Sequence, residues 1–200
     1  MHSKTMLACC LLGMAALTAQ AQMGNAVVTT APPPATIVAP STALDAQLSI
    51  IEMEMMPAVK AMPADKFAFA PTQTIFASGQ KTEFATVRTF AQQATHVAEA
   101  NYFFYSGVSG LKPDVDTKAI LTLTKKDDVV AALAGSFAFA HKAIATITPA
   151  NAFETLKVEE PGLWTRTTLS SFGVAHAFDH YGQMVEYLRM NGVIPPASAK

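Results

Sequence analysis

The sequence predicts an all-α protein, a four-helix bundle with long connections between its helices. Four segments place apolar residues three and four positions apart, the pattern of a helix that buries one face. The connections have roughly 20 residues each, so consecutive helices need not be antiparallel neighbours and a crossover topology is open. Half of the 200 residues are hydrophobic and 14% are charged, which suits one globular domain with a substantial core.

The first 21 residues have the features of a signal peptide. Lys4 supplies a positive charge, residues 6–18 form an apolar run, and Ala-Gln-Ala at 19–21 forms a cleavage site. The run has about 13 residues, whereas about 20 are needed to span a bilayer, so removal is expected rather than anchoring. We therefore expect a mature protein that begins near Gln22, is periplasmic or secreted, and has no membrane span.

Both cysteines, Cys9 and Cys10, lie in this signal peptide. A lipidated Cys9 is disfavoured because most of the apolar run follows it. The mature chain then has no thiol, which excludes a disulfide framework and a cysteine nucleophile. The formal net charge is −1 and no basic face is available, so we expect no nucleic-acid partner.

Residues 22–41 are rich in Pro and Thr and read as a linker, followed by one domain over residues 42–197. The first helix is predicted from Thr42 to Met62, and its methionines are interpreted as core packing. Pro57 lies inside this helix and predicts a kink. Apolar residues in the connection that follows, including Phe67 and Phe69, are expected to cap one end of the bundle.

The second helix is predicted to follow Thr86 as N-cap and to end near Ser106, with His96 at the border of its apolar stripe. The third is predicted to start after Thr124 and to end before residue 148. His141 in the third helix is interpreted as a half-exposed structural residue.

The fourth helix is predicted from Thr168 to just before Gly192, which is placed to end it. Trp164, just before this helix, is interpreted as an end-cap aromatic, with a role as a cover over a site as the alternative. Polar groups interrupt the predicted buried face and would cost several kcal/mol if unpaired. This face contains Leu169, Phe172, His176, His180, Gln183 and Tyr187.

His176 and His180 are four residues apart, so their imidazoles stand on one helix face about 5 to 6 Å apart. With His96 from another helix they form a candidate three-histidine metal site that leaves a coordination position open. Asp179 and Gln183 are candidates for orienting the ligand imidazoles through hydrogen bonds. The alternative is a set of hydrogen-bonded core side chains without a metal.

Two stretches resemble the DinB-like family of four-helix metalloproteins, which is related to bacillithiol and mycothiol transferases. They are Val87-Arg88-x7-His96-Val97-Ala98-x-Ala100-Asn101-Tyr102-Phe103-Phe104 and His176-x3-His180-Tyr181-Gly182-Gln183-x3-Tyr187-Leu188-Arg189-x2-Gly192-x2-Pro195-Pro196. The resemblance covers about residues 42–197. It implies a divalent metal, commonly nickel or zinc, bound by one histidine of the second helix and an H-x3-H pair of the fourth; His96, His176 and His180 match these positions.

Two classes of function follow. The first is an exported metal-dependent enzyme, in which the metal lowers the pKa of a bound water or thiol for thiol transfer to, or hydrolysis of, a small molecule. The relatives that the resemblance implies are intracellular, whereas this chain is expected to be exported. Export makes a thiol-transferase activity less favoured. The second is a non-catalytic metal-binding or ligand-binding module. The expected partners are a small-molecule substrate or thiol, and a homodimer is open.

Overall fold

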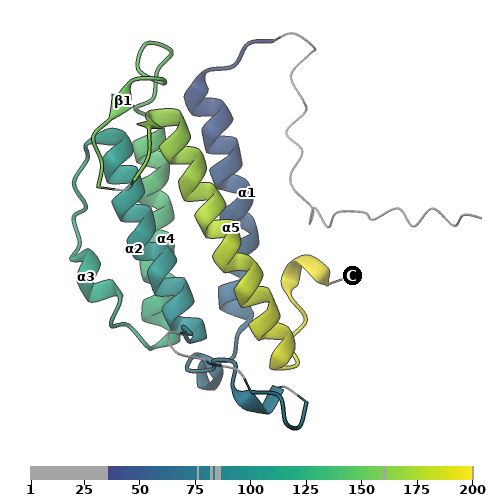
Figure 1. Ribbon diagram of the computed structural model, residues 1–200. Coiled ribbons are helices and arrows are strands. Elements are labelled where there is room, and N and C mark those ends of the chain that lie inside the picture. The colour runs from purple at the N-terminus through teal and green to yellow at the C-terminus, as the bar shows by residue number, and fades with distance from the viewer. Residues whose placement is uncertain (1–35, 76, 82, 84–86, 160, 200) are drawn as a thin grey trace, which may run out of the picture.

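A computed structural model describes residues 36–75, 77–81, 83, 87–159 and 161–199. The predicted signal peptide and most of the predicted linker lie outside this part of the chain. Four long helices form a bundle, which confirms the all-α prediction (Figure 1). They are α1 (Pro40–Ala61), α2 (Phe90–Ser109), α4 (Lys126–Ile144) and α5 (Arg166–Met190). The smaller elements are η1 (Ala64–Lys66), η2 (Gln73–Ile75), α3 (Thr117–Ile120), β1 (Thr155–Leu156), β2 (Trp164–Thr165) and η3 (Pro196–Ser198).

The bundle has a crossover topology. Helix α2 packs against α4 and α5, and α1 packs against the same two helices, so α1 and α2 occupy opposite corners. Helices α2 and α4 run in the same direction, because the connection that contains α3 returns along the length of the bundle (Figure 1). Helix α5 runs antiparallel to α2, and these are the two helices that carry the candidate metal ligands.

Apolar side chains from all four long helices fill the core, among them Met55, Val97, Leu133 and Leu188, each 0% exposed. Met56 and Met62 are also buried, which confirms the core-packing interpretation for three methionines of the predicted first helix, whereas Met53 is 41% exposed and does not belong to the core. None of the described helices combines the length and the apolar character needed to cross a membrane.

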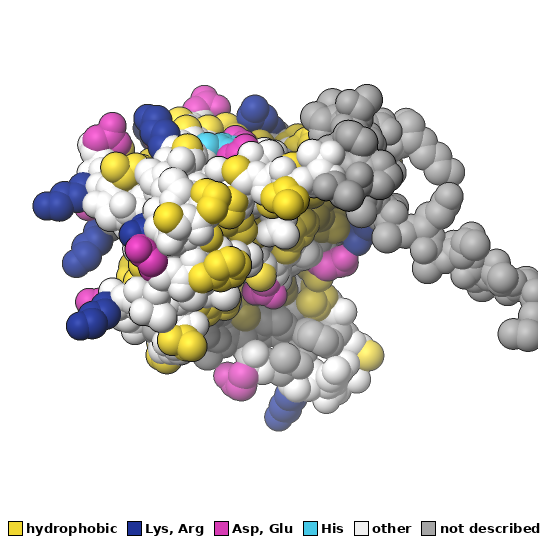
Figure 2. Space-filling view, turned by 90° about the horizontal axis from the view of Figure 1, so that it is seen from above, with side chains coloured by type: hydrophobic (Ala, Val, Ile, Leu, Met, Phe, Trp, Pro, Cys, Tyr) yellow, Lys and Arg dark blue, Asp and Glu magenta, His cyan; other side chains and the backbone are white. Residues whose placement is uncertain are grey.

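The end of the bundle shown in Figure 2 contains the α4–α5 connection, where β1 and β2 pair antiparallel. Hydrophobic side chains reach the surface on this end, and Phe153 and Leu163 of the connection are exposed. Basic and acidic side chains are interspersed there rather than gathered into one basic patch. Trp164 packs on Phe172 at this end, with ring centroids 5.0 Å apart, which fits an end-cap role.

The start of α2 differs from the prediction. The predicted N-cap, Thr86, lies outside the described residues, and the helix begins only at Phe90 with Thr89 as its N-cap. The Thr89 N–H donates to Gln92 Oε1 at 2.9 Å, and the Gln92 N–H donates to Thr89 Oγ1 at 3.2 Å. This reciprocal capping box satisfies two backbone donors and determines where the helix starts.

The connection between α1 and α2 also supports the start of α2. The Phe90 N–H donates to the Phe69 carbonyl at 2.8 Å, and the Ala91 N–H donates to the Phe67 carbonyl at 2.9 Å. Phe67 is buried and its ring meets that of Phe90 edge to face, with centroids 5.4 Å apart. The connection thus closes this end of the bundle, as predicted, and supplies acceptors for N–H groups that a helix start leaves unpaired.

The other helix boundaries lie close to the predicted ones. Helix α1 begins at Pro40, two residues earlier than predicted, because proline suits the first turn of a helix. It continues through Pro57 to Ala61, and the kink remains a prediction. Helix α4 begins at Lys126 with Lys125 as N-cap and no side-chain cap, so the predicted cap at Thr124 is wrong.

Helix α5 begins at Arg166, after the N-cap Thr165, which shares a capping box with Thr168. At the other end, Gly192 has φ +72°, which confirms its predicted role as the residue that ends the helix. The Gly192 N–H donates to the Arg189 carbonyl and the Val193 N–H to the Leu188 carbonyl. These two bonds form a Schellman motif.

Candidate metal centre

The three predicted ligands, His96, His176 and His180, lie together between α2 and α5. One ring nitrogen from each lies within 4.8 Å of the other two. The Nε2 atoms of His96 and His176 are 3.2 Å apart. Two nitrogen ligands at 2.0 to 2.1 Å from a tetrahedral ion are about 3.3 Å apart. The spacing therefore suits one shared ion, and no fourth His, Cys, Asp or Glu joins this group in the described part of the chain.

A close approach of α2 and α5 places His96 opposite the His176 and His180 pair. Gly173 lies three residues before His176, and a Cβ added there would be only 3.1 Å from the Tyr105 hydroxyl oxygen. The Tyr105 hydroxyl donates to the Ser170 carbonyl at 3.3 Å in the buried interior. Gly173 and Tyr105 therefore set the separation and the register of the two helices that carry the histidines.

A chain of hydrogen bonds orients His180. Its Nδ1 is 2.5 Å from Gln93 Oε1. Gln93 Nε2 donates to Gln183 Oε1 at 2.8 Å, and Gln183 Nε2 donates to Asp179 Oδ2 at 3.1 Å. Because an amide oxygen only accepts, His180 Nδ1 carries the proton and Nε2 keeps the free lone pair. This is the tautomer in which Nε2 can bind a metal.

Sequence reasoning identified part of this chain. Asp179 and Gln183 belong to it, but neither bonds directly to an imidazole, and Gln183 is exposed rather than buried. Gln93, which contacts His180, was missed although it is only 2% exposed. The pattern held a clue, since Gln93 lies three residues after Phe90 and four before Val97 on the apolar stripe of α2.

The Nδ1 atom of His176 differs from that of His180, which bonds Gln93. His176 Nδ1 is buried and has no hydrogen-bond partner among the described residues. The Phe104 ring packs edge to face on this imidazole, with centroids 5.4 Å apart, so His176 is held by packing rather than by a polar partner. The three-nitrogen geometry suits a metal, whereas the supporting hydrogen bond is present for His180 and absent for His176.

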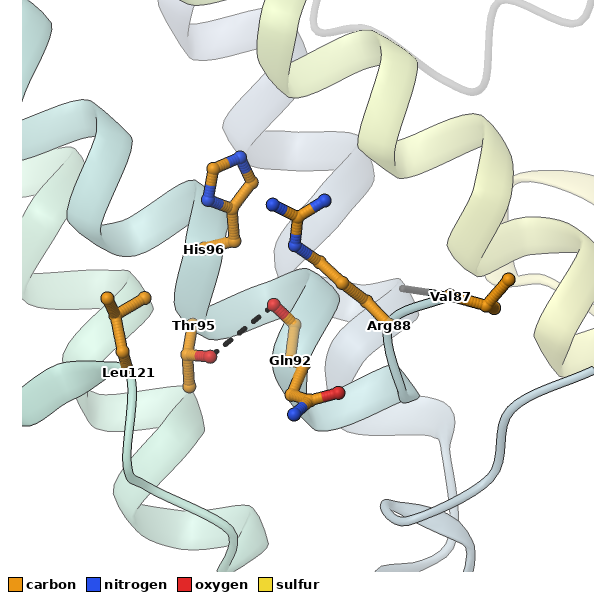
Figure 3. A pocket seen from close by; sticks show the side chains of 6 residues that line it. All are labelled: Val87, Arg88, Gln92, Thr95, His96 and Leu121. Atoms are coloured by element: carbon orange, nitrogen blue, oxygen red, sulfur yellow. Dashed lines mark hydrogen bonds between the residues drawn. The ribbon is translucent and has the colours of Figure 1, made fainter. Parts of the chain in front are cut away.

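A pocket of about 560 Å³ opens beside His96. Figure 3 shows the side chains that line it. Its lining residues are Val87, Arg88, Gln92, Thr95, His96 and Leu121. The Arg88 side chain extends toward His96, so that its guanidinium group lies near the imidazole. The Tyr187 hydroxyl donates to the Arg88 carbonyl at 3.1 Å and ties this segment to α5. The pocket therefore gives a small molecule access to His96 from the Arg88 side.

The sequence matches the family model of the DinB superfamily over residues 47–184. The chain belongs to the DinB superfamily. The matched span contains most of the bundle and all three histidines. No curated protein matches this sequence significantly.

The imidazoles of this DinB-superfamily protein are held neutral. Burial, with the positive charge of Arg88 next in size, lowers the pKa of His96 to about 4. Burial also lowers the pKa of His176 to about 4 and that of His180 below its ordinary value, although the nearby Asp179 raises both. A neutral imidazole is the form that binds a metal, so no proton has to leave the site near pH 7.

His141 of this DinB-superfamily protein links two helices, which fits the structural role interpreted from the sequence. Its Nδ1 lies 2.5 Å from Asp45 Oδ1 and its Nε2 lies 2.9 Å from Glu52 Oε2, which joins α4 to α1. Burial lowers the pKa of His141, but the hydrogen bonds and charges of the two carboxylates outweigh it, and the pKa is raised. His141 is not part of the three-histidine cluster.

Proposed function

We propose that His96, His176 and His180 hold one divalent transition metal ion, zinc or nickel. The observation that carries this proposal is the convergence of three neutral imidazoles from two helices at ligand spacing. Membership of the DinB superfamily, whose proteins bind metals, supports it. Imidazole ligands suit zinc and nickel better than calcium or magnesium, which prefer oxygen.

We further propose that the protein is a metal-dependent enzyme that acts on a small molecule by thiol transfer or hydrolysis. Three protein ligands leave a coordination position free, and one of them, His96, lines a pocket of about 560 Å³. An ion bound there acts as a Lewis acid and lowers the pKa of a water or thiol ligand. Gln93 keeps His180 in its metal-binding tautomer, and the aromatic ring of Phe104 packs against His176.

The second candidate is a non-catalytic metal-binding or ligand-binding module. One observation favours it: no carboxylate joins the imidazoles among the described residues, and Asp179 accepts a hydrogen bond from Gln183 rather than from an imidazole. In this part of the chain, no carboxylate is therefore placed among the imidazoles to act as a general base for hydrolysis.

Metal content tests the proposal that the three histidines hold one ion. Elemental analysis of purified protein is expected to give close to one zinc or nickel ion per chain, and His176→Ala and His180→Ala are expected to lose it. His141→Ala is the matched control, since it removes a histidine outside the cluster and should keep the metal. Circular dichroism establishes that each variant is folded. Full metal content in folded His176→Ala and His180→Ala would contradict the proposal.

Ligand exchange separates the two candidate functions. In cobalt-substituted protein, a thiol that reaches the free position is expected to change the visible spectrum, because thiolate is a good ligand for such ions. Thiols that bind are then assayed with electrophilic small molecules and with hydrolysable esters. A spectrum that no thiol or anion changes would favour the binding module.

We also propose that the protein is exported after removal of residues 1–21, on the basis of the charged start, the apolar run and the Ala-Gln-Ala site. N-terminal sequencing of secreted or periplasmic protein is expected to begin at or near Gln22. An intact Met1 on protein confined to the cytoplasm would contradict export. Association as a homodimer is a further proposal, which sedimentation analysis of the purified chain tests.

A further inference from the structure

Arg88 is held beside the metal centre by contacts from α5. It precedes the N-cap of α2 by one residue, and the hydrogen bond from Tyr187 to its carbonyl keeps this backbone segment in place. Its side chain is exposed and extends into the pocket toward His96 (Figure 3). The guanidinium group therefore lines the same space as a candidate metal ligand.

The Arg88 guanidinium has no protein partner within the described ranges. The other two described arginines do: Arg166 pairs with Glu154 at 3.5 Å, and Arg189 pairs with Glu186 at 2.5 Å. The described part of the chain provides no hydrogen bond or ion pair for the Arg88 side chain. Its five N–H donors are available to a molecule in the pocket.

The charges at the site are also unbalanced. The three imidazoles are neutral ligands, and no carboxylate belongs to their group among the described residues. A bound divalent ion together with Arg88 would outweigh the negative charge of the nearby Asp179 and leave the site with an excess of positive charge. Arg88 and His96 line the same pocket, and the Arg88 side chain extends toward the imidazole, so this positive charge lies at the cluster itself. The compensating negative charge is then expected to come from the ligand.

We propose that the small molecule bound at this site carries a carboxylate group, which Arg88 binds while another group of the same molecule reaches the ion. This inference rests on the proposed metal site. A guanidinium fork matches a carboxylate with two parallel hydrogen bonds. The pocket volume of about 560 Å³ is in the range of small-molecule sites, and Gln92 and Thr95 add polar groups to its lining.

Two thiols that differ in one group test the proposal in cobalt-substituted protein. Mercaptoacetate carries a carboxylate, whereas 2-mercaptoethanol carries a hydroxyl in its place. The wild type is expected to bind mercaptoacetate about 10- to 100-fold more tightly, as followed by the thiolate-to-cobalt absorption. Acetate serves as the control ligand that has the carboxylate but no thiol. It is expected to bind more weakly than mercaptoacetate because it lacks the sulfur ligand.

Arg88→Gln is expected to abolish the preference for mercaptoacetate while leaving the affinity for 2-mercaptoethanol within about 3-fold of the wild type. Arg88→Lys should keep part of the preference, because it keeps the charge but loses the fork. Arg189→Gln is the matched control, an arginine paired with Glu186 on the surface, and should keep the preference in full.

Metal affinity gives a second readout that does not depend on any thiol. Arg88→Gln is expected to bind cobalt at least as tightly as the wild type, because a repelling positive charge is gone. If the wild type binds no cobalt, the proposed metal site itself is wrong. If cobalt binds but the wild type and Arg88→Gln show the same preference between the two thiols, the carboxylate proposal alone is overturned.

Discussion

His96 Nε2 and His176 Nε2 lie 3.2 Å apart although 80 positions separate the two residues in the chain. Both imidazoles are neutral near pH 7, since burial lowers the pKa of each to about 4. Two neutral imidazoles facing each other through the same ring atom share at most one hydrogen bond. An ion between them would use both lone pairs.

The first prediction concerns Gln93. Gln93→Leu removes the acceptor that fixes the tautomer of His180 and is expected to weaken metal affinity about 10- to 100-fold. Gln183→Leu removes the partner of Gln93, which does not itself contact the imidazole, and is expected to weaken metal affinity less. Competition with a fluorescent chelator measures both affinities. Equal effects of the two variants would show that contact with the imidazole is not what matters.

The second prediction concerns the stability of metal-free protein in acid. The unfolded chain takes up protons on histidine near pH 6.5, whereas folded His96 and His176 do so only near pH 4. Stability is therefore expected to fall as pH is lowered from about 6.5 to 5, by up to about 1.4 kcal/mol per pH unit for each such histidine. Urea unfolding with a chelator present measures it, and His176→Gln should reduce the slope.

The third prediction concerns His141, whose contribution to stability is expected to depend on pH in the opposite direction. The folded-state pKa of His141 is raised by its carboxylate partners, so its contribution is complete below the unfolded pKa of about 6.5 and is lost as pH rises through the folded pKa. The contribution is expected to be at most about 1 kcal/mol, because the pair partners are partly exposed. Urea unfolding of His141→Gln should lack this loss above pH 6.5. A wild-type loss that persists in His141→Gln would assign it to another group.

The fourth prediction compares two glycines of α5. Gly173→Ala places a methyl group against the buried Tyr105 ring and is expected to cost about 1 to 3 kcal/mol and to weaken metal binding. Gly182→Ala meets nothing within 4 Å, so it is expected to stabilise the protein by about 0.5 to 1 kcal/mol and leave metal binding unchanged. Thermal unfolding and metal titration of both variants check this contrast. A neutral Gly173→Ala would mean that the helix separation is not set there.

Sequence reasoning was most successful where the pattern is local. The spacing of His176 and His180 on one helix determines that both imidazoles share a face, and the apolar periods predicted all four long helices. That His96 lies opposite this pair depends on how two distant helices pack. Its role was proposed from its position at the border of the apolar stripe, and the family resemblance then matched the same position.

The parts that sequence reasoning missed depend on contacts between distant segments. Gln93 and His180 are 87 positions apart, so no local pattern joins them. The start of α2 was placed at Thr86 because Val87 continues the apolar period. In the structure Val87 is 38% exposed, and the capping box of Thr89, with the carbonyls of the preceding connection, begins the helix later.

The crossover gives an ion at this site a role in the unfolding of elements that it does not touch. Helices α3 and α4 lie in sequence between α2 and α5, so a metal bridge from His96 to His176 would close a loop around both of them. Such a bridge acts as a reversible cross-link. At a free metal concentration of 100 times the dissociation constant, metal binding would raise the free energy of unfolding by about 2.7 kcal/mol. Amide hydrogen exchange in the α4 backbone would then slow as metal is added, although α4 contributes no ligand.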